Sequence, residues 1–317
     1  MEQFRTYSPE DIILSNLEET THAHTAVFEQ ELAHLAELAE ELVSSNEDDT
    51  ETLSGLPDFH LPESVLTDDN ILPQHRDMLQ KLQLLQWTQK KLLLVEEIRK
   101  KLGLGRFALP NILDYGAERT KPVEDGRIIY QKSVLTDTAY LQFAKLLNAP
   151  RASYAKSFLE ACENVYNGIC QYCILPLENN SEGRMINFTK LIDRFGLKIV
   201  MTSDVLINDG TDSIRFALLQ RELHTPYNNA SYEGQYLEIA FHAEATPTLA
   251  ELLTAAQLCG LTLSKIHEFP APEDPERVAY HTIFQIGDAL LSTFLLYLAM
   301  EVPHHIPIGI YTHFKSK

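Results

Sequence analysis

The fold class of this 317-residue chain is decided by the stretch Cys173-Ile174-Leu175-Pro176-Leu177-Glu178-Asn179-Asn180-Ser181-Glu182-Gly183. Its apolar first half is typical of a buried strand, and its second half is a polar turn that offers an acid, an amide, a hydroxyl and a glycine. Open α/β sheets place their ligands at the carboxyl ends of strands. The pattern therefore predicts a strand with a ligand-binding turn at its end, and an ordinary turn explains the same residues equally well.

Short apolar runs alternate with helical stretches on both sides of this strand. Strands are expected at 127–131, 173–177, 197–201 and 214–220, and helices at 138–147, 157–166 and 188–195. This alternation predicts an α/β unit with a mainly parallel sheet. After a polar break at 222–234, we expect a strand at 236–242, a helix at 249–259, strands at 261–267 and 278–285, a helix at 288–300 and a strand at 306–311. That order, βαββαβ, is the ferredoxin-like arrangement.

The N-terminal part of the chain is predicted to be helical. Ser8-Pro9-Glu10-Asp11 is a good helix start, and apolar residues recur at the helical period to about Val43. Residues 44–72 are rich in Asp, Ser, Thr and Pro and are expected to form a linker. A second helix follows Pro73 and stops at Gly103. The two helices fit an antiparallel pair, and a bundle with another copy of the chain fits equally well.

Three domains are therefore expected, in a protein that combines α/β and α+β architecture. Residues 1–122 form an acidic helical region, and residues 123–230 form one α/β lobe of the kind found in periplasmic binding proteins. Residues 235–317 form the ferredoxin-like domain.

The formal net charge of −19 is concentrated in one segment of the chain. Residues 1–70 carry eighteen Asp and Glu and a single basic residue, Arg5, so their net charge is −17; the other 247 residues have a net charge of −2. An acidic segment of this kind repels phosphate backbones and anionic lipid headgroups. We therefore expect neither a nucleic-acid partner nor a membrane partner.

Cysteine usage and hydropathy favour a cytoplasmic protein. Four cysteines are too few for a disulfide framework, the N-terminus shows no signal peptide, and the longest apolar run, 289–300, is too short to span a bilayer. Cys170-Gln171-Tyr172-Cys173 has the spacing of a redox motif, but Cys173 enters a strand and not a helix N-terminus. His304-His305 has no cysteine near it in the sequence, and a surface pair is expected there. We expect no metal site and no cofactor.

Several of these residues, taken in order, resemble the prephenate dehydratase family. The stretch around Glu178 resembles that family's Pro-Ile-Glu-Asn-Ser turn. Ala139-Tyr140 resembles part of its Gly-Ala-Tyr-Ser loop, and Ser213-Ile214-Arg215-Phe216 resembles its Thr-Arg-Phe strand. The positions that the resemblance marks as site residues are Tyr140, Glu178, Asn179, Ser181, Gly183, Arg215 and Phe216.

The last part of the chain, 235–313, looks like the ACT regulatory domain that follows the dehydratase in this family. Thr246-Pro247-Thr248-Leu249 stands at the family's Gly-Ala-Leu loop, and Ile266-His267-Glu268-Phe269-Pro270 stands at its Ile-Glu-Ser-Arg-Pro strand end. The resemblance implies a homodimer through paired sheets and a small aromatic amino acid or a dicarboxylate as ligand. The implied effector-binding residues are Pro247, Thr248, Leu249, Ile266, His267 and Pro270.

Two departures from the family bear on catalysis. The reaction of prephenate dehydratases removes carbon dioxide and water, which requires a group that protonates the departing hydroxyl; the family uses the threonine of Thr-Arg-Phe, and here Ile214 stands in its place. In the family a second lobe is inserted before that strand. Here only 201–212 is available, whereas a single βαβ unit needs about 30 residues.

The expected function is therefore that of a degenerate prephenate dehydratase-like protein, non-catalytic and regulatory or structural, in phenylalanine biosynthesis. The alternative is an active carbon–oxygen lyase, or a bifunctional chorismate mutase/prephenate dehydratase, whose cleft is completed by the N-terminal region or a partner chain. A mutase site needs several cations, and 6–75 contains no Lys or Arg. Bases that follow this segment are expected on the solvated face of the second helix, namely Arg76, Lys90, Lys91, Arg99 and Lys100.

Overall fold

The computed structural model describes residues 73–105, 126–147, 150–207, 210–223, 234–242, 248–270, 278–302 and 304–314. The helix expected at 8–43, the linker expected at 44–72 and Pro247 lie outside these ranges.

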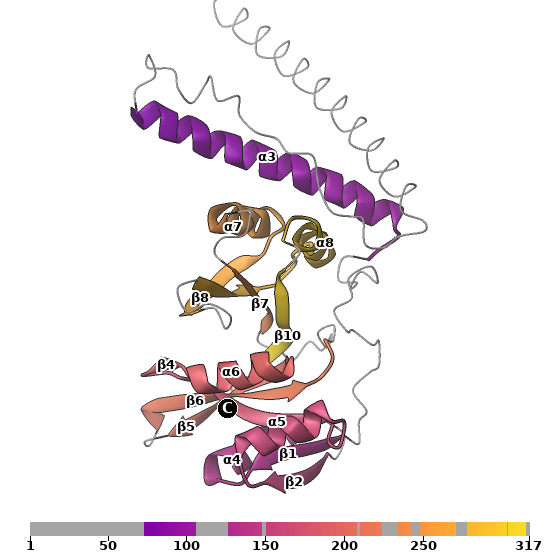
Figure 1. Cartoon of the computed structure of the whole chain (residues 1–317), viewed down its shortest axis with the longest axis vertical. Coiled ribbons are helices and arrows are strands. Elements are labelled where there is room, and N and C mark those ends of the chain that lie inside the picture. Colours follow the sequence, from indigo (N-terminus) through magenta and orange to yellow (C-terminus); the bar gives the residue numbers. More distant parts are fainter. Residues whose placement is uncertain are drawn as a thin grey trace, which may run out of the picture.

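Helices and strands follow one another in the order that the sequence predicts (Figure 1). The first half contains α3 (Pro73–Lys101), β1 (Arg127–Gln131), α4 (Val134–Ala144), β2 (Arg151–Ala155), α5 (Phe158–Tyr166), β3 (Tyr172–Asn179), β4 (Gly183–Arg184), α6 (Ile186–Phe195), β5 (Lys198–Ile207) and β6 (Asp212–Gln220). The second half contains β7 (Gly234–His242), α7 (Leu249–Leu258), β8 (Thr262–Pro270), β9 (Val278–Gln285), α8 (Leu291–Glu301) and β10 (Ile306–Phe314). Only β2 and β4 were not expected.

Local signals set the ends of several helices. At the start of α4, the Ser133 hydroxyl accepts from the Thr136 backbone N–H at 3.1 Å, and the Ser133 N–H donates to Thr136 Oγ1 at 2.9 Å, which closes a capping box. Helix α6 ends at Gly196, whose φ of +59° lies in the left-handed region that favours glycine.

The expectation of a mainly parallel sheet is wrong for the first half. Strand β1 pairs in parallel with β2 and β3, but β6 pairs antiparallel with both β3 and β5. The reason is the short connection at 208–211, because a turn of this length can join only antiparallel neighbours.

A single sheet runs through both halves of the chain. Its strand order is β2-β1-β3-β6-β5-β10-β7-β9-β8, with β4 paired to β3. The segment β10-β7-β9-β8 is the antiparallel ferredoxin-like sheet, and β10 pairs in parallel with β5 of the first half. Hydrogen bonds between β5 and β10 join the two predicted parts, 123–230 and 235–317. Their division into separate domains stays a prediction.

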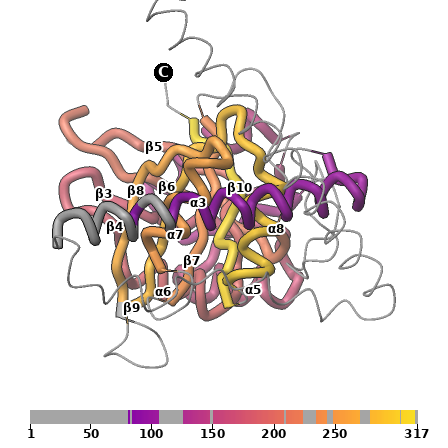
Figure 2. The backbone as a smooth tube through the Cα atoms, turned by 90° about the horizontal axis from the view of Figure 1, so that it is seen from above, coloured from indigo at the N-terminus to yellow at the C-terminus, as the bar shows by residue number. Residues whose placement is uncertain are grey.

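Helices cover both faces of this sheet. In the first half, α4 packs against a cluster that contains Ile128 and Tyr130, whereas α5 and α6 pack against the opposite face, with Ile129 and Leu175. The second cluster continues into the ferredoxin-like part through Tyr311, so the two halves share a core. Helices α7 and α8 cover the ferredoxin-like sheet, and α3 crosses over both of them (Figure 2).

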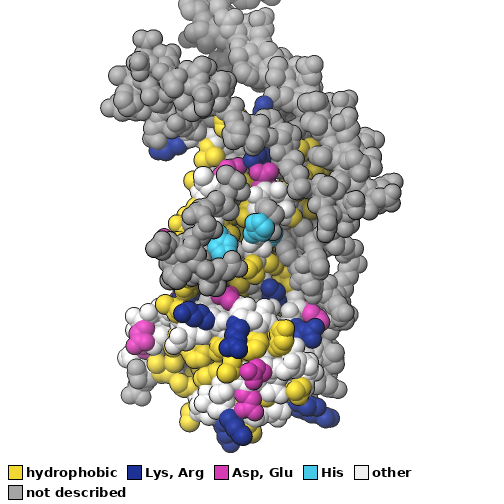
Figure 3. All heavy atoms as spheres, viewed as in Figure 1, with side chains coloured by type: hydrophobic (Ala, Val, Ile, Leu, Met, Phe, Trp, Pro, Cys, Tyr) yellow, Lys and Arg dark blue, Asp and Glu magenta, His cyan; other side chains and the backbone are white. Residues whose placement is uncertain are grey.

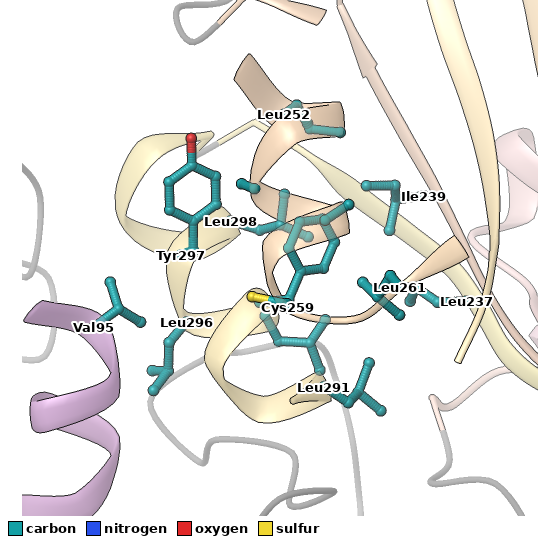
Figure 4. Packing of buried hydrophobic residues seen from close by; sticks show 14 of the residues in the cluster. Val95, Leu237, Ile239, Leu252, Cys259, Leu261, Leu291, Leu296, Tyr297 and Leu298 are labelled. Atoms are coloured by element: carbon teal, nitrogen blue, oxygen red, sulfur yellow. The ribbon is translucent and has the colours of Figure 1, made fainter. Parts of the chain in front are cut away.

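Helix α3 is docked on α7 and α8 by apolar side chains. Leu92, Val95 and Ile98 are buried in one cluster with Leu296 and Leu298 of α8. Figure 4 shows Val95 of α3 beside Leu296. Burial of one such side chain contributes about 1.5–3 kcal/mol. Among the described residues, no helix is long and apolar enough to cross a membrane.

The basic residues of α3 do not all lie on a solvated face, which corrects the sequence-based expectation. Lys91 Nζ lies 3.2 Å from Glu251 of α7 and 2.5 Å from Glu301 of α8, and all three side chains are at most 15% exposed. Arg99 pairs with Glu96 at 2.8 Å and is also largely buried. Lys100 does lie at the surface, 55% exposed. The packing of α3 against α7 and α8 gives Lys91 its acidic partners, whereas Arg99 pairs with Glu96 of α3 itself.

Candidate functional site

The conspicuous polar cluster of the first half lies across the ends of three neighbouring strands. Arg215 of β6 is the register partner of Glu178 on β3 and of Asp204 on β5. The Arg215 guanidinium donates to Asp204 through Nε at 2.9 Å and Nη2 at 3.2 Å, and its Nη1 lies 3.6 Å from Glu178 Oε2. Two of the predicted site residues, Glu178 and Arg215, are therefore brought together.

A residue from the second half completes this cluster. Lys265 of β8 forms an ion pair and a hydrogen bond with Glu178 Oε1. In the sheet order, β6, β5, β10, β7 and β9 lie between β3 and β8, so the contact shows that the sheet curls until strands near its ends meet. We call Glu178, Asp204, Arg215 and Lys265 the interdomain charge cluster.

The cluster is electrically balanced within itself. It holds two carboxylates and two cations, and the Arg215 and Lys265 side chains are 31% and 38% exposed, against 12% for Glu178. Burial alone raises the pKa of Asp204, but the nearby His313 imidazole together with the hydrogen bonds and charge of Arg215 outweighs it and holds this pKa far below its usual range. Asp204 is therefore ionised at neutral pH.

Next to the cluster, a histidine links β10 to β5. His313 Nε2 lies 3.4 Å from Asp204 Oδ2, and its Nδ1 lies 3.0 Å from the Thr202 hydroxyl. This hydroxyl–imidazole–carboxylate order resembles a nucleophile and its base. Thr202 is only 1% exposed, however, so a substrate cannot reach its oxygen, and the contacts serve to hold β5 and β10 together.

The turn after Glu178 is closed by its own side chains. Asn179 Oδ1 accepts from the Ser181 backbone N–H at 3.0 Å and lies 2.8 Å from the Ser181 hydroxyl, which is 2.7 Å from Asp212 Oδ2. Gly183 has a φ of +83° and pairs with Asn179. These three predicted site residues therefore shape the β3–β4 hairpin.

Tyr140 and Phe216 belong to the apolar cluster between α4 and the sheet. Tyr140 donates to the Pro150 carbonyl at 2.8 Å and stacks on Tyr130 at 5.4 Å between ring centroids. Phe216 is 2% exposed in the cluster under α4, and Ile214 packs against the same cluster. Both Ile214 and Phe216 neighbour Arg215 on β6, but successive strand residues point to opposite faces of the sheet, so their side chains lie on the face away from that of Arg215.

The predicted effector residues are spread over α7 and β8. Thr248 caps α7 by accepting from the Glu251 N–H at 3.3 Å, and Leu249 packs against the core under α7 and α8. Ile266 is 37% exposed, and the neighbouring His267 has its pKa lowered by burial. Pro270 is the last residue of β8. No ligand role of these residues is tested, and it stays a prediction.

A second polar cluster, which the sequence analysis missed, lies under the ferredoxin-like sheet. Glu238 of β7 is fully buried and accepts from Arg184 Nη2 of β4 at 2.6 Å and from the Tyr311 hydroxyl at 3.3 Å, and His281 Nδ1 lies 3.8 Å away. Burial opposes its ionisation, but Arg184 and His281 lower the pKa of Glu238 to about 2. This pair is a second charge contact between the two halves.

The signal for the missed residues is a lone charge in an apolar run. Glu238 interrupts Tyr236-Leu237-Glu238-Ile239-Ala240, and Asp204 interrupts Ser203-Asp204-Val205-Leu206. Ionised residues are almost never fully buried without a partner, so each lone charge predicts a counter-charge. The sequence does not say which residue supplies it.

The described residues offer neither a metal-binding group nor a thiol suited to redox chemistry. None of these residues form a group of three or more His, Cys, Asp and Glu side chains that could hold a metal ion. All four cysteines are buried as free thiols, and interaction with Cys162 together with burial raises the pKa of Cys173. A raised pKa disfavours the thiolate on which redox chemistry depends.

Comparison with known proteins identifies the fold. No protein-family model matches the sequence, and no curated protein matches it either. The structure is similar to that of prephenate dehydratase from Streptococcus mutans, with a TM-score of 0.50 and 21% identity over 60% of this chain and 99% of that one.

Two further solved structures match at a TM-score of 0.45. One is GqqA, described as a novel type of quorum quenching acylase, at 18% identity over 59% of this chain and 94% of that one. The other is prephenate dehydratase in complex with L-Phe from Arthrobacter aurescens, at 13% identity over 58% of this chain and 89% of that one. The likeness to the Streptococcus mutans structure shows that this chain has a prephenate dehydratase-like fold.

Proposed function

We propose that this prephenate dehydratase-like protein is non-catalytic and acts as a regulatory or structural component of phenylalanine biosynthesis. The observation that carries the proposal is the state of Arg215. Among the described residues, its guanidinium forms ion pairs with two carboxylates of its own chain, Asp204 and Glu178. A substrate with two carboxylates would have to displace them, in a cluster whose net charge is already zero.

The connection between β5 and β6 supports the same conclusion. Residues 208–211 join two strands that pair along their whole length, from Lys198↔Gln220 to Ile207↔Asp212. No second lobe is inserted at this point of the chain. A dehydratase needs a closed site that excludes water from the reacting carboxylates, and a single lobe offers only one of its walls.

Ile214 also supports the absence of catalysis, because it stands where the family has a proton donor. Its side chain carries no proton donor, and it packs with apolar neighbours under α4. A group that protonates a leaving hydroxyl must lie within hydrogen-bond reach of it.

The deciding experiment follows phenylpyruvate formation from prephenate and prephenate formation from chorismate with the purified chain. We expect no turnover with either substrate, and an active prephenate dehydratase serves as the positive control. Turnover of about one per second or faster would contradict the proposal. The Ile214→Thr variant restores the threonine of the family's Thr-Arg-Phe motif. We expect it to remain inactive because Arg215 stays paired with Asp204 and Glu178.

A regulatory role also implies a ligand or a partner for the ferredoxin-like part. A thermal-shift screen with phenylalanine, tyrosine and tryptophan tests the ligand, because any ligand that prefers the folded state raises the melting temperature. A homodimer through paired sheets would use β8, since β10 is already paired on both sides by β5 and β7. Sedimentation at micromolar concentration that showed only a monomer would remove the dimer.

A further inference from the structure

Glu178 lies between two cations that come from different halves of the chain. Its Oε1 contacts Lys265 of β8, and its Oε2 faces Nη1 of Arg215 on β6. Each oxygen of a single carboxylate thus meets a different cation. A ligand carboxylate placed there would find the same pair of donors.

The exposure of the three side chains shows which of them a ligand can reach. Arg215 and Lys265 are 31% and 38% exposed, whereas Glu178, which lies between them, is 12% exposed. The cations are therefore open to solvent, and the group that neutralises them is the least accessible member of the three.

The contact between Glu178 and Arg215 is also loose. The distance of 3.6 Å between Oε2 and Nη1 exceeds that of a hydrogen bond. Asp204 takes Nε and Nη2 of the same guanidinium, so Nη1 is the nitrogen turned toward Glu178. A carboxylate that is free to move can approach Nη1 more closely than one fixed at the end of β3.

We propose that Arg215 and Lys265 form a binding site for a small organic carboxylate, and that Glu178 holds this site closed as an internal substitute for the ligand. The inference goes beyond the proposed function, and it does not depend on whether the chain catalyses a reaction. Because Arg215 lies on the lobe and Lys265 on the ferredoxin-like sheet, ligand entry would exchange the Glu178 bridge between the halves for a bridge through the ligand.

The test removes the charge of Glu178 and measures carboxylate binding to the full chain. Glu178 competes at a high effective concentration because it belongs to the same chain, so the Glu178→Gln variant should bind succinate at least about tenfold more tightly than the wild type by calorimetry. Glu182→Gln, which makes the same change in the exposed part of the same turn, should bind as weakly as the wild type.

Two double variants identify the cations. The gain in affinity should disappear in Glu178→Gln/Lys265→Met and in Glu178→Gln/Arg215→Met. An unchanged affinity in Glu178→Gln, or a gain that survives in either double variant, would overturn the proposal. An equal gain for sulfate at the same ionic strength would overturn the assignment to carboxylates.

A further variant covers the case in which Glu178→Gln does not fold. Lys265→Met alone removes a cation that is 38% exposed and should abolish the weak succinate response of the wild-type melting temperature. An undiminished response would overturn the proposal. The readout is binding, so prephenate turnover by the wild type would contradict the proposed function and leave this site standing.

Discussion

Lys91 lies on the side of α3 that is turned toward α7 and α8, close to the buried Leu92 and Val95. Burial lowers the pKa of its ammonium, but the hydrogen bond and charge of Glu301, together with Glu251, outweigh this and raise it. A single cation thus neutralises two carboxylates from two different helices. Without it, Glu251 and Glu301 would face each other without a counter-charge.

The Lys91→Met variant should therefore lower the free energy of unfolding by about 3 kcal/mol, as expected when one partner of a buried ion pair is removed. Urea denaturation provides the measurement. Lys100→Met is the matched control, because Lys100 is 55% exposed and its ion pair with Glu97 lies at the surface, so its loss should cost no more than about 0.5 kcal/mol. Equal effects of the two substitutions would contradict the bridging role of Lys91.

Glu238 gives the stability of the protein a defined dependence on pH. Its pKa in the folded state is about 2, against an ordinary value of 4.5, so it stabilises the folded state above pH 4.5. This contribution, of about 3 kcal/mol, is lost as the pH falls from 4.5 through 2. Unfolding measured from pH 7 to 2 should show a flatter dependence in Glu238→Gln. The Glu268→Gln variant, which changes an exposed side chain, should keep the wild-type dependence of unfolding on pH.

At the scale of the residue, the sequence predicted which residues belong to the polar cluster better than it predicted which residues they pair with. Glu178 and Arg215 were expected to be site residues and do meet. Asp204 and Lys265 were not, because their partners lie on strands that are distant in sequence, and neither composition nor periodicity reports on such pairs.

At the scale of the element, Gly309 of β10 decides whether the two halves can join. A Cβ at this position would lie 2.5 Å from the carbonyl oxygen of Ile199 on β5 and 2.8 Å from the Ile199 Cβ. The close approach of β10 to β5 thus depends on the absence of a side chain. An isolated glycine within a strand is a known sign of such an approach.

The Gly309→Ala variant should lose about 1–3 kcal/mol of stability, because the added methyl overpacks the β5–β10 ladder. The control is Gly105→Ala, where a Cβ would meet no atom within 4 Å. Thermal unfolding of both variants is the measurement. A Gly309→Ala variant as stable as the Gly105→Ala variant would show that β10 and β5 are less closely packed than described.

Periodicity predicted most elements because their apolar residues are buried in a regular pattern. Strands β1 and β9 have the predicted ends. Strand β2, Arg151–Ala155, escaped because it lies at the edge of the sheet and only Ala155 is buried, so it carries no apolar pattern. The direction of β6 and the pairing of β5 with β10 escaped because both depend on tertiary contacts.

At the scale of the whole molecule, charge and packing make the halves one unit. Figure 3 shows that acidic and basic side chains are interspersed on the described part of the face in view. This agrees with the net charge of −2 counted outside residues 1–70. The continuous sheet, the shared core around Tyr311 and the ion pair of Arg184 with Glu238 all cross between the halves.

Unfolding should therefore be a single cooperative transition. The chain has one tryptophan, Trp87 in α3, so its fluorescence reports on the docking of that helix, whereas far-ultraviolet circular dichroism reports on the whole chain. The two signals should change at the same urea concentration. A fluorescence transition at lower urea would show that α3 detaches from α7 and α8 first.

The place of β10 in the sheet also bears on how the chain is made. It is the last described strand in the sequence, yet it lies in the middle of the strand order, between β5 and β7. Until residues 306–314 have left the ribosome, β5 keeps an open edge and the ferredoxin-like sheet lacks its border strand. Until then the nascent protein exposes two unpaired strand edges, one on β5 and one on β7. Binding of a chaperone to these edges would protect the chain from aggregation most during this interval.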